Sequence, residues 1–227
     1  MTTMNEIARG GASVSQATQA TQTSPASPAT EASKNDALAN WKDHVAPSGP
    51  CSPAEMAQRI ARFGELPASP RAFVDTWVKG HERTLLSVIG SGVTDNPDFK
   101  PKIAAAENFH VDFITAPKGC GAAMHWHTTE EVFIAQAGRW EVDWIDGATG
   151  NVHTVTLHPR DTISVPPRVH RAFRSLDGDD LAQGGGLLIS VLGGKVPDRV
   201  KWDVSLQQKA VAAGVGFDAA GNAVKLA

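Results

Sequence analysis

Residues 119–138 read GCGAAMHWHTTEEVFIAQAG and contain two histidines and an acid at close spacing. His125 and His127 are two residues apart, and Glu131 follows four residues later. Alternate residues of a strand point to the same face, so a strand here places both imidazoles side by side and Trp126 on the other face. The three residues before Glu131 can turn the chain and return its carboxylate to that face. We therefore expect the two imidazoles and the carboxylate to converge.

Two histidines and one carboxylate form the facial triad that binds non-haem iron and leaves coordination positions open. The alternative is a solvated strand whose histidines and acid have no joint role. Glycines at both ends of the segment, Gly119 and Gly138, stand at the offsets expected of a metal motif and favour the metal site.

This spacing resembles the first motif of the cupin superfamily: Gly, five residues, His-x-His, three residues, Glu, six residues, Gly. The five motif positions are all matched, by Gly119, His125, His127, Glu131 and Gly138. The resemblance implies an all-β fold, an antiparallel jelly-roll β-barrel (double-stranded β-helix) that holds the metal inside its mouth. It implies no single reaction, because cupins include dioxygenases, isomerases, decarboxylases, lyases, sugar-binding sensors and storage proteins.

Composition limits the class of partner and compartment. The 227 residues, of which 41% are hydrophobic, suffice for one core with additional arms. A net charge of −3 gives no basic surface, so we expect no nucleic-acid partner. The sequence has no apolar run of about 18 residues and no secretory signal, so we expect no membrane association. Two cysteines, Cys51 and Cys120, are too few for a disulfide framework, and we expect a cytoplasmic protein.

The chain divides into four predicted parts. Residues 1–37 are rich in Ala, Ser, Thr, Gln and Pro, and are predicted to be a disordered tail. Residues 38–80 are predicted to form an N-terminal helical arm, and residues 81–200 the cupin barrel. Residues 201–227 are predicted to be a C-terminal extension that is partly helical and then frays.

The arm is predicted from two helix starts. Ser52 and Glu55 form a capping box at the start of a helix expected to run to about Phe63. A second short helix is predicted from Pro70 to about Val78. We expect the arm to wrap the barrel or a partner subunit, and we predict a homodimer with the arm or an outer sheet edge in the interface.

About eight short strands with turns between them predict a sandwich or barrel. Residues 109–114 alternate large apolar and other side chains, which predicts a strand with one buried face. Residues 146–150, DGATG, predict a hairpin turn. The strands are predicted at residues 85–89, 109–114, 131–137, 140–145, 152–157, 162–165, 169–175 and 187–192.

The second cupin motif runs Gly, five residues, Pro-x-Gly, two residues, His, three residues, Asn, and its histidine is the usual fourth metal ligand. Residues 160–175, RDTISVPPRVHRAFRS, correspond to it. Aligned on Pro166 without a gap, Arg160 and Arg168 replace the two glycines. Arg171 then stands in place of the histidine.

His170 lies one position earlier, and on a regular strand it would point to the opposite face. Making His170 a fourth ligand requires a one-residue deletion or a β-bulge. We therefore expect Arg171 to face the barrel interior and the metal to keep His125, His127 and Glu131, with His170 as the alternative fourth ligand. Three protein ligands are sufficient for Fe(II) chemistry.

An inward Arg171 would present a planar guanidinium suited to a substrate carboxylate. The equal alternative is an ion pair with Glu130 or another acid of the barrel. A further alternative is a vestigial site that binds metal weakly because the fourth ligand is replaced.

These features predict a metal-dependent cupin enzyme, an oxygenase that acts on a small organic acid or phenolic compound, with Fe(II) as the first choice of metal and Mn, Ni or Zn behind it. The reaction class is implied by the resemblance alone. The alternatives are a cupin isomerase, lyase or decarboxylase, and a non-catalytic cupin that binds a small molecule. The chain contains no Tyr, which leaves metal-bound water or Glu as candidates for proton transfer.

Overall fold

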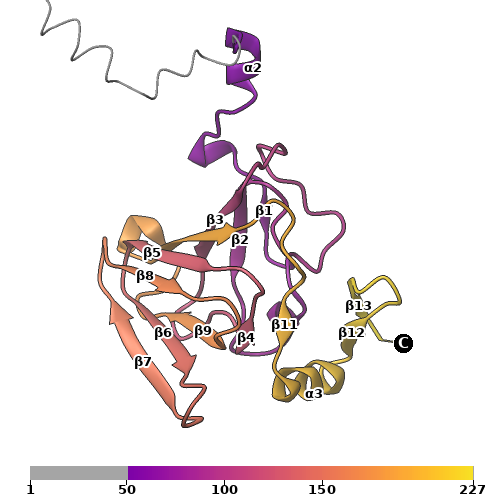
Figure 1. Ribbon diagram of the computed structural model, residues 1–227. Helices are drawn as coiled ribbons and strands as arrows, with labels where there is room; N and C mark the ends of the chain where they lie inside the picture. The colour runs from indigo at the N-terminus through magenta and orange to yellow at the C-terminus, as the bar shows by residue number, and fades with distance from the viewer. Residues whose placement is uncertain (1–50, 227) are drawn as a thin grey trace, which may run out of the picture. The chain divides into compact units, whose positions relative to one another are not determined.

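The computed structural model describes residues 51–226 (Figure 1). The predicted tail, residues 1–37, and the first part of the predicted arm lie outside the described residues. None of the helices within residues 51–226 is both long enough and apolar enough to cross a membrane.

The fold consists of two antiparallel sheets, and a small hairpin follows them near the C-terminus. The six-stranded sheet contains, in spatial order, β1 (Ala68–Ser69), β2 (Thr84–Ile89), β3 (Phe109–Thr115), β10 (Leu187–Gly193), β5 (Glu131–Ala137) and β8 (Thr162–Val165). The five-stranded sheet contains β11 (Lys201–Trp202), β4 (His125–Trp126), β9 (Arg171–Ser175), β6 (Trp140–Ile145) and β7 (Val152–Leu157). From β3 to β6, and again from β7 to β11, consecutive strands alternate between the two sheets, and the predicted jelly roll is confirmed.

The core lies between the two sheets, because each strand directs alternate side chains inward. Phe133 of β5 and Trp140 of β6 are both 0% exposed. Phe173 of β9 packs against both, with ring centroids 5.1 Å from Phe133 and 6.0 Å from Trp140. The aromatic cluster therefore joins the two sheets at the centre of the barrel.

Strand β3 buries the face that carries its polar residues. His110 and Ile114 are buried, whereas Phe109 is 46% exposed. Phe113 packs outside the barrel against Phe63, with ring centroids 5.6 Å apart. The predicted strand is confirmed, and its phenylalanines are on the outer face, whereas Asp112 and Ile114 line the interior cavity.

The first predicted helix is shorter than expected. The capping box is present, since Ser52 Oγ accepts from Glu55 N at 3.2 Å and Glu55 Oε2 accepts from Ser52 N at 2.7 Å. Helix α2 nevertheless covers only Pro53–Ala57, and Phe63 begins a separate 3₁₀ turn, η1 (Phe63–Glu65). Its apolar side is exposed, with Met56 49% accessible, so no packing stabilises further turns.

The second predicted helix is wrong over most of its length. Ala68 and Ser69 form β1, which pairs with β2, and Phe73 is extended. Only the 3₁₀ helix η2 (Val74–Trp77) is helical. Strand pairing outweighs the helix-start signal here, and it directs η2 into the barrel, where Asp75 is 0% exposed.

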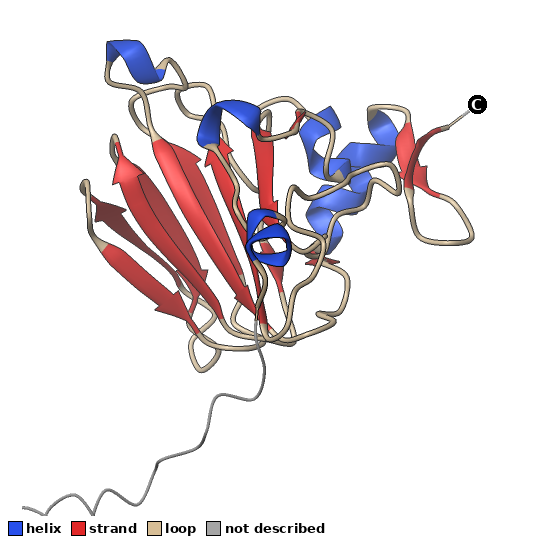
Figure 2. Ribbon diagram, turned by 90° about the horizontal axis from the view of Figure 1, so that it is seen from above, coloured by secondary structure: helices blue, strands red, loops and turns tan. Residues whose placement is uncertain are grey.

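The C-terminal extension is ordered beyond its helix (Figure 2). Helix α3 (Val204–Ala212) is capped by Asp203, whose Oδ1 accepts from Ser205 N at 2.8 Å. Strands β12 (Val215–Phe217) and β13 (Ala223–Lys225) then form a hairpin. The predicted fraying is wrong, because Val215 is 2% exposed and packs with Leu206 of α3.

The expected turn between β6 and β7 is confirmed by Gly150 N, which donates to the Asp146 carbonyl O at 2.7 Å. Within residues 51–226, β7 pairs only with β6, so it forms an edge of the five-stranded sheet. An unpaired edge is a common place for chains to associate. The homodimer stays a prediction.

Two arginines of the second motif adopt the backbone conformation of glycine. Arg160 has φ 80° and Arg168 has φ 65°, and they are the two non-glycine residues with positive φ in the described chain. Both side chains are exposed. The backbone at these two motif positions thus has the left-handed conformation that suits glycine, although both residues are arginine.

The strain at Arg168 predicts a stabilising substitution. A side chain with a Cβ costs about 1–2 kcal/mol in the left-handed region, and glycine loses roughly 0.5–1 kcal/mol of this gain through its unfolded-state entropy. We expect Arg168→Gly to raise the free energy of unfolding by roughly 0.5–1 kcal/mol in urea titrations. Arg168→Ala keeps the Cβ and should give no gain, and equal stability of the two variants would contradict this explanation.

Candidate metal centre

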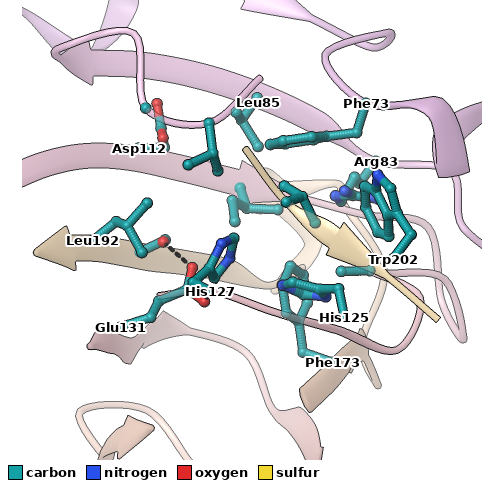
Figure 3. Close-up of a pocket in the computed structure, with 16 residues that line it drawn as sticks. Phe73, Arg83, Leu85, Asp112, His125, His127, Glu131, Phe173, Leu192 and Trp202 are labelled. Carbon is teal, nitrogen blue, oxygen red and sulfur yellow. Dashed lines mark hydrogen bonds and ion pairs between the residues drawn. The ribbon is translucent and has the colours of Figure 1, made fainter. Parts of the chain in front are cut away.

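The two motif histidines and the motif glutamate meet inside the barrel (Figure 3). His125 lies on β4, His127 follows this strand directly, and Glu131 is the first residue of β5. Their potential ligand atoms all lie within 4.8 Å of one another. The three residues are 4%, 2% and 6% exposed, respectively. A turn brings Glu131 back to the imidazoles, as the spacing predicts.

The glycines that bound this segment have left-handed backbones. Gly119 has φ 79° and Gly138 has φ 62°. Glycine adopts these angles without a steric penalty. A Cβ on Gly138 would also lie 2.6 Å from the Cα of Gly186, so the glycine allows close packing of two chain segments.

His125 is held in the form that binds a metal. Its Nδ1 lies 2.7 Å from the carbonyl O of Ala123, so Nδ1–H donates to this oxygen and Nε2 keeps its lone pair. Burial, followed by the nearby His127, lowers the pKa of His125 well below its usual value. The imidazole is therefore neutral and already oriented.

Glu131 is a buried carboxylate surrounded by donors. Burial alone would raise its pKa, but His127, through its charge and hydrogen bond, and then Arg171 hold the pKa of Glu131 well below its usual range. Ser190 Oγ donates to Glu131 Oε1 at 2.8 Å, and Nε2 of His127 lies 3.4 Å from Oε2. The carboxylate is thus ionised and fixed in orientation.

Arg171 points inward, as the ungapped alignment predicts. It is 0% exposed, its Nε donates to Glu131 Oε2 at 3.1 Å, and its Nη1 donates to the Val169 carbonyl O at 2.9 Å. Arg171 lies behind Glu131 and does not line the metal cavity. Of the two roles considered for Arg171, the structure shows the ion pair with an acid of the barrel. That acid is Glu131, not Glu130.

His170 lies away from the other histidines. It is half-buried, and its ring centroid is 6.4 Å from that of Trp126. Strand β9 pairs with β6 without a register shift, from Ser175 to Arg171. With no bulge in this pairing, His170 remains on the outer side of the sheet.

The candidate ligands line a small cavity of about 40 Å³. One water molecule needs roughly 10–15 Å³ by this measure, so the cavity has room for about three atoms of water size. Its other polar side chains are Arg83, Asp112 and Ser190, and most of the remaining wall is apolar. The donor set and this space fit a divalent metal with small ligands at its open positions. His127 supports this fit, since its buried Nδ1 has no partner among the described residues.

Arg83, which sequence reasoning missed, is the cation that lines this cavity. It is 5% exposed, and its Nη1 donates to Asp75 Oδ2 at 2.8 Å and to the His81 carbonyl O at 3.2 Å. Its guanidinium lies over the Phe73 ring at 4.9 Å (Figure 3). An arginine just before an apolar strand is usually solvent-exposed, so the sequence carried no signal for its burial.

The Arg83–Asp75 ion pair also supports a candidate ligand. Asp75 Oδ2 accepts from Ala123 N at 3.0 Å, and the carbonyl O of Ala123 accepts from His125. Outer partners of this kind orient metal-binding histidines. Helix η2 therefore contributes to the orientation of His125.

Asp112 is a second residue that sequence reasoning missed. Burial raises its pKa to about 7, the nearby Glu131 adds to this effect, and the neighbouring Ser87 hydroxyl opposes it. A carboxyl group with this pKa exchanges its proton near neutral pH. Asp112 is therefore a candidate proton carrier of the cavity.

The structure is a jelly roll with a candidate metal site of two histidines and a glutamate in its interior. Residues 112–182 match the family model described as a cupin domain. This match covers the central strands of the barrel and supports the resemblance to the cupin superfamily.

Among solved structures, the chain is similar to a mutant of oxalate decarboxylase OxdC from Bacillus subtilis, at 14% identity over 59% of this chain and 28% of that chain, with a TM-score of 0.42. It is also similar to KdgF from Halomonas sp., at 14% identity over 50% and 80% of the two chains, with a TM-score of 0.36. A cupin 2 domain-containing protein from Halorhodospira halophila gives 15% identity over 57% and 76%, with a TM-score of 0.40. No curated protein sequence matches the chain significantly.

Histidines inside the cavity and outside it allow a matched test of which residues bind the metal. We expect His125→Ala and His127→Ala to abolish bound metal, because two ligands hold a divalent ion too weakly. His170→Ala removes the same side chain on the outer side of β9 and should leave metal content unchanged. Elemental analysis of metal-loaded proteins after dialysis measures this. Metal loss in the His170 variant would contradict the arrangement.

The raised pKa of Asp112 predicts a dependence of stability on pH. Between about pH 4 and pH 7 the folded chain keeps a proton that the unfolded chain has lost, so this group lowers stability as the pH rises. Asp112→Asn removes the titration. We expect the metal-free variant to gain stability relative to the wild type on going from pH 4 to pH 8 in urea unfolding. A difference that does not vary with pH would be evidence against the raised pKa.

Proposed function

We propose that this protein is a metal-dependent cupin enzyme that acts on a small organic acid, with Fe(II) as its metal and an oxygenase reaction. The proposal depends on one observation, the enclosure of two histidines, an ionised glutamate and a buried arginine around a single small cavity. Three protein ligands leave open positions for other ligands on the metal. The metal would be held by His125, His127 and Glu131.

The size of the cavity favours a small acid over a phenolic compound. A cavity that takes up a benzene ring measures about 150 Å³. The cavity beside His125 measures about 40 Å³ and has Phe73, Phe173 and Trp202 in its wall. An acid of a few heavy atoms fits this space, and an aromatic ring does not.

The charge balance of the site favours an anion. Arg171 is paired with Glu131, and Arg83 is paired with Asp75, so these two ion pairs are neutral, and Asp112 adds no charge in its protonated form. A divalent ion would then add its full double charge to a mostly apolar space. An anionic substrate offsets that charge, and burial strengthens the attraction.

Arg83 supplies the directional contact with the acid. Its Nη1 is engaged by Asp75 and His81, and its Nη2 makes no hydrogen bond within residues 51–226. A planar guanidinium binds a carboxylate with good geometry. Arg83 thus takes the substrate role first expected of Arg171.

Asp112 is the group that can move a proton in this cavity. Its pKa of about 7 leaves both protonation states populated at neutral pH. A bound Fe(II) ion would supply Lewis acidity and electrons for oxygen chemistry. The apolar wall, which includes Leu85 and Ile114, limits entry of bulk water.

A second candidate function is a non-catalytic cupin that binds a small acid. The replacement of the fourth ligand by Arg171 favours it. Oxygen uptake by iron-loaded protein with a panel of small carboxylic and keto acids distinguishes the two functions. Turnover with any acid supports the enzyme, whereas acid binding that survives complete removal of metal, without turnover, supports the binding protein.

The role of Arg83 predicts a loss of acid affinity. A hydrogen bond to a charged group contributes about 1.5–3 kcal/mol, so Arg83→Gln should weaken binding of formate or acetate to the metal-loaded protein at least tenfold. Calorimetric titration measures the affinity, and Arg83→Lys tests whether charge alone restores part of it. The matched control is Arg139→Gln, which removes a surface ion pair with Asp177 and should not change the affinity. Equal affinities for the Arg83→Gln variant and the wild type would exclude this role.

A further inference from the structure

A second, larger cavity of about 660 Å³ lies beside the metal cavity. It is formed where β4 and β11 of the barrel face α3 and β12 of the C-terminal extension. Cavities of roughly 300–1,000 Å³ are typical of small-molecule sites. This outer pocket was not expected from the sequence, since the extension was predicted to fray.

The outer pocket is separate from the metal site. None of the three candidate ligands lines it, and it shares only Val200 and Trp202 with the metal cavity. The Trp202 ring centroid lies 5.4 Å from that of His125, and its Nε1 donates to Asp95 Oδ2 at 3.3 Å. Trp202 is therefore a fixed wall with one cavity on each side.

The wall of the outer pocket is mainly apolar and aromatic. Trp126 and Trp202 come from the barrel, and Phe217 and Val211 come from the extension. Phe217 is 43% exposed and Val211 is 60% exposed, although both are large apolar side chains. Aromatic side chains of this kind bind a planar ring through broad contacts.

Two cations give the pocket its charge. Arg199 and Lys201 both line it, and within residues 51–226 neither forms an ion pair with a carboxylate at contact distance. Arg199 donates to the Gly221 carbonyl O and to Asn222 Oδ1, which are neutral acceptors. Asp95 is the one acid in the lining, and its Oδ2 accepts from Val74 N and from the Trp202 indole. Two cations and one acid leave an excess of positive charge.

We propose that the outer pocket binds an aromatic carboxylate, with its ring against Trp126, Trp202 and Phe217 and its carboxylate paired with Arg199 and Lys201. An aromatic ring buries the exposed apolar wall, and a carboxylate meets the excess positive charge. This site does not depend on the metal or on the proposed reaction.

The test is a calorimetric titration of the full, metal-free chain with 2-naphthoate. The matched neutral probe is 2-naphthamide, which has the same ring without the charge. We expect saturable binding of the acid and at least tenfold weaker binding of the amide. Arg199→Gln and Lys201→Gln should each weaken binding of the acid several-fold, and Phe217→Ala should weaken binding of both probes.

Two control variants separate this site from its surroundings. Lys209→Gln removes an exposed charge from α3 outside the pocket lining and should leave the affinity unchanged. Asp112→Asn changes a residue that lines the metal cavity and not the outer pocket, and it should also leave the affinity unchanged. Equal binding of acid and amide, no saturation at millimolar concentration, or loss of binding in the Asp112 variant would overturn the proposal.

Discussion

The contact between Arg171 and Glu131 is the interaction on which the site depends. A buried carboxylate is costly unless it is paired and hydrogen-bonded, and Glu131 receives donors from Arg171 and Ser190. Arg171 stands on β9 opposite His125 on β4, so the pair also joins the two sheets at the candidate metal centre. The residue that replaces a fourth ligand thus holds the third ligand in its ionised form.

The ion pair of Arg171 with Glu131 means that another residue must provide the positive charge for an anionic substrate. Because the Arg171 charge is used by Glu131, the proposed function assigns recognition of an anion to Arg83, which lines the cavity next to β2 of the six-stranded sheet. Arg83 needs its own counter-ion in so buried a place, and Asp75 provides it at 2.8 Å. The same carboxylate bonds the Ala123 peptide that orients His125. The Arg83–Asp75 ion pair would therefore serve two purposes. It holds the arginine proposed to bind the anion, and it helps to orient His125.

The sequence predicts the convergence of the three candidate ligands well, because it follows from local spacing. The jelly roll is predicted by the resemblance of that spacing to the first cupin motif. The sequence also predicts the inward direction of Arg171, since a strand without a bulge fixes the face of each residue. Arg83 and Asp112 could not be predicted, because their burial depends on strands that are distant in the sequence. The short helices differ from expectation for a related reason: caps mark where a helix begins, whereas packing decides how far it continues.

The two aromatic side chains that close the metal cavity come from distant parts of the chain. Phe73 precedes the barrel strands and Trp202 follows them, and their ring centroids lie 6.1 Å apart. During synthesis on the ribosome, the histidines and Glu131 emerge well before Trp202. The centre therefore passes through a stage in which its ligands are present and its wall is incomplete. A metal ion would have its easiest access to the candidate ligands during this interval, before the last part of the chain folds over them.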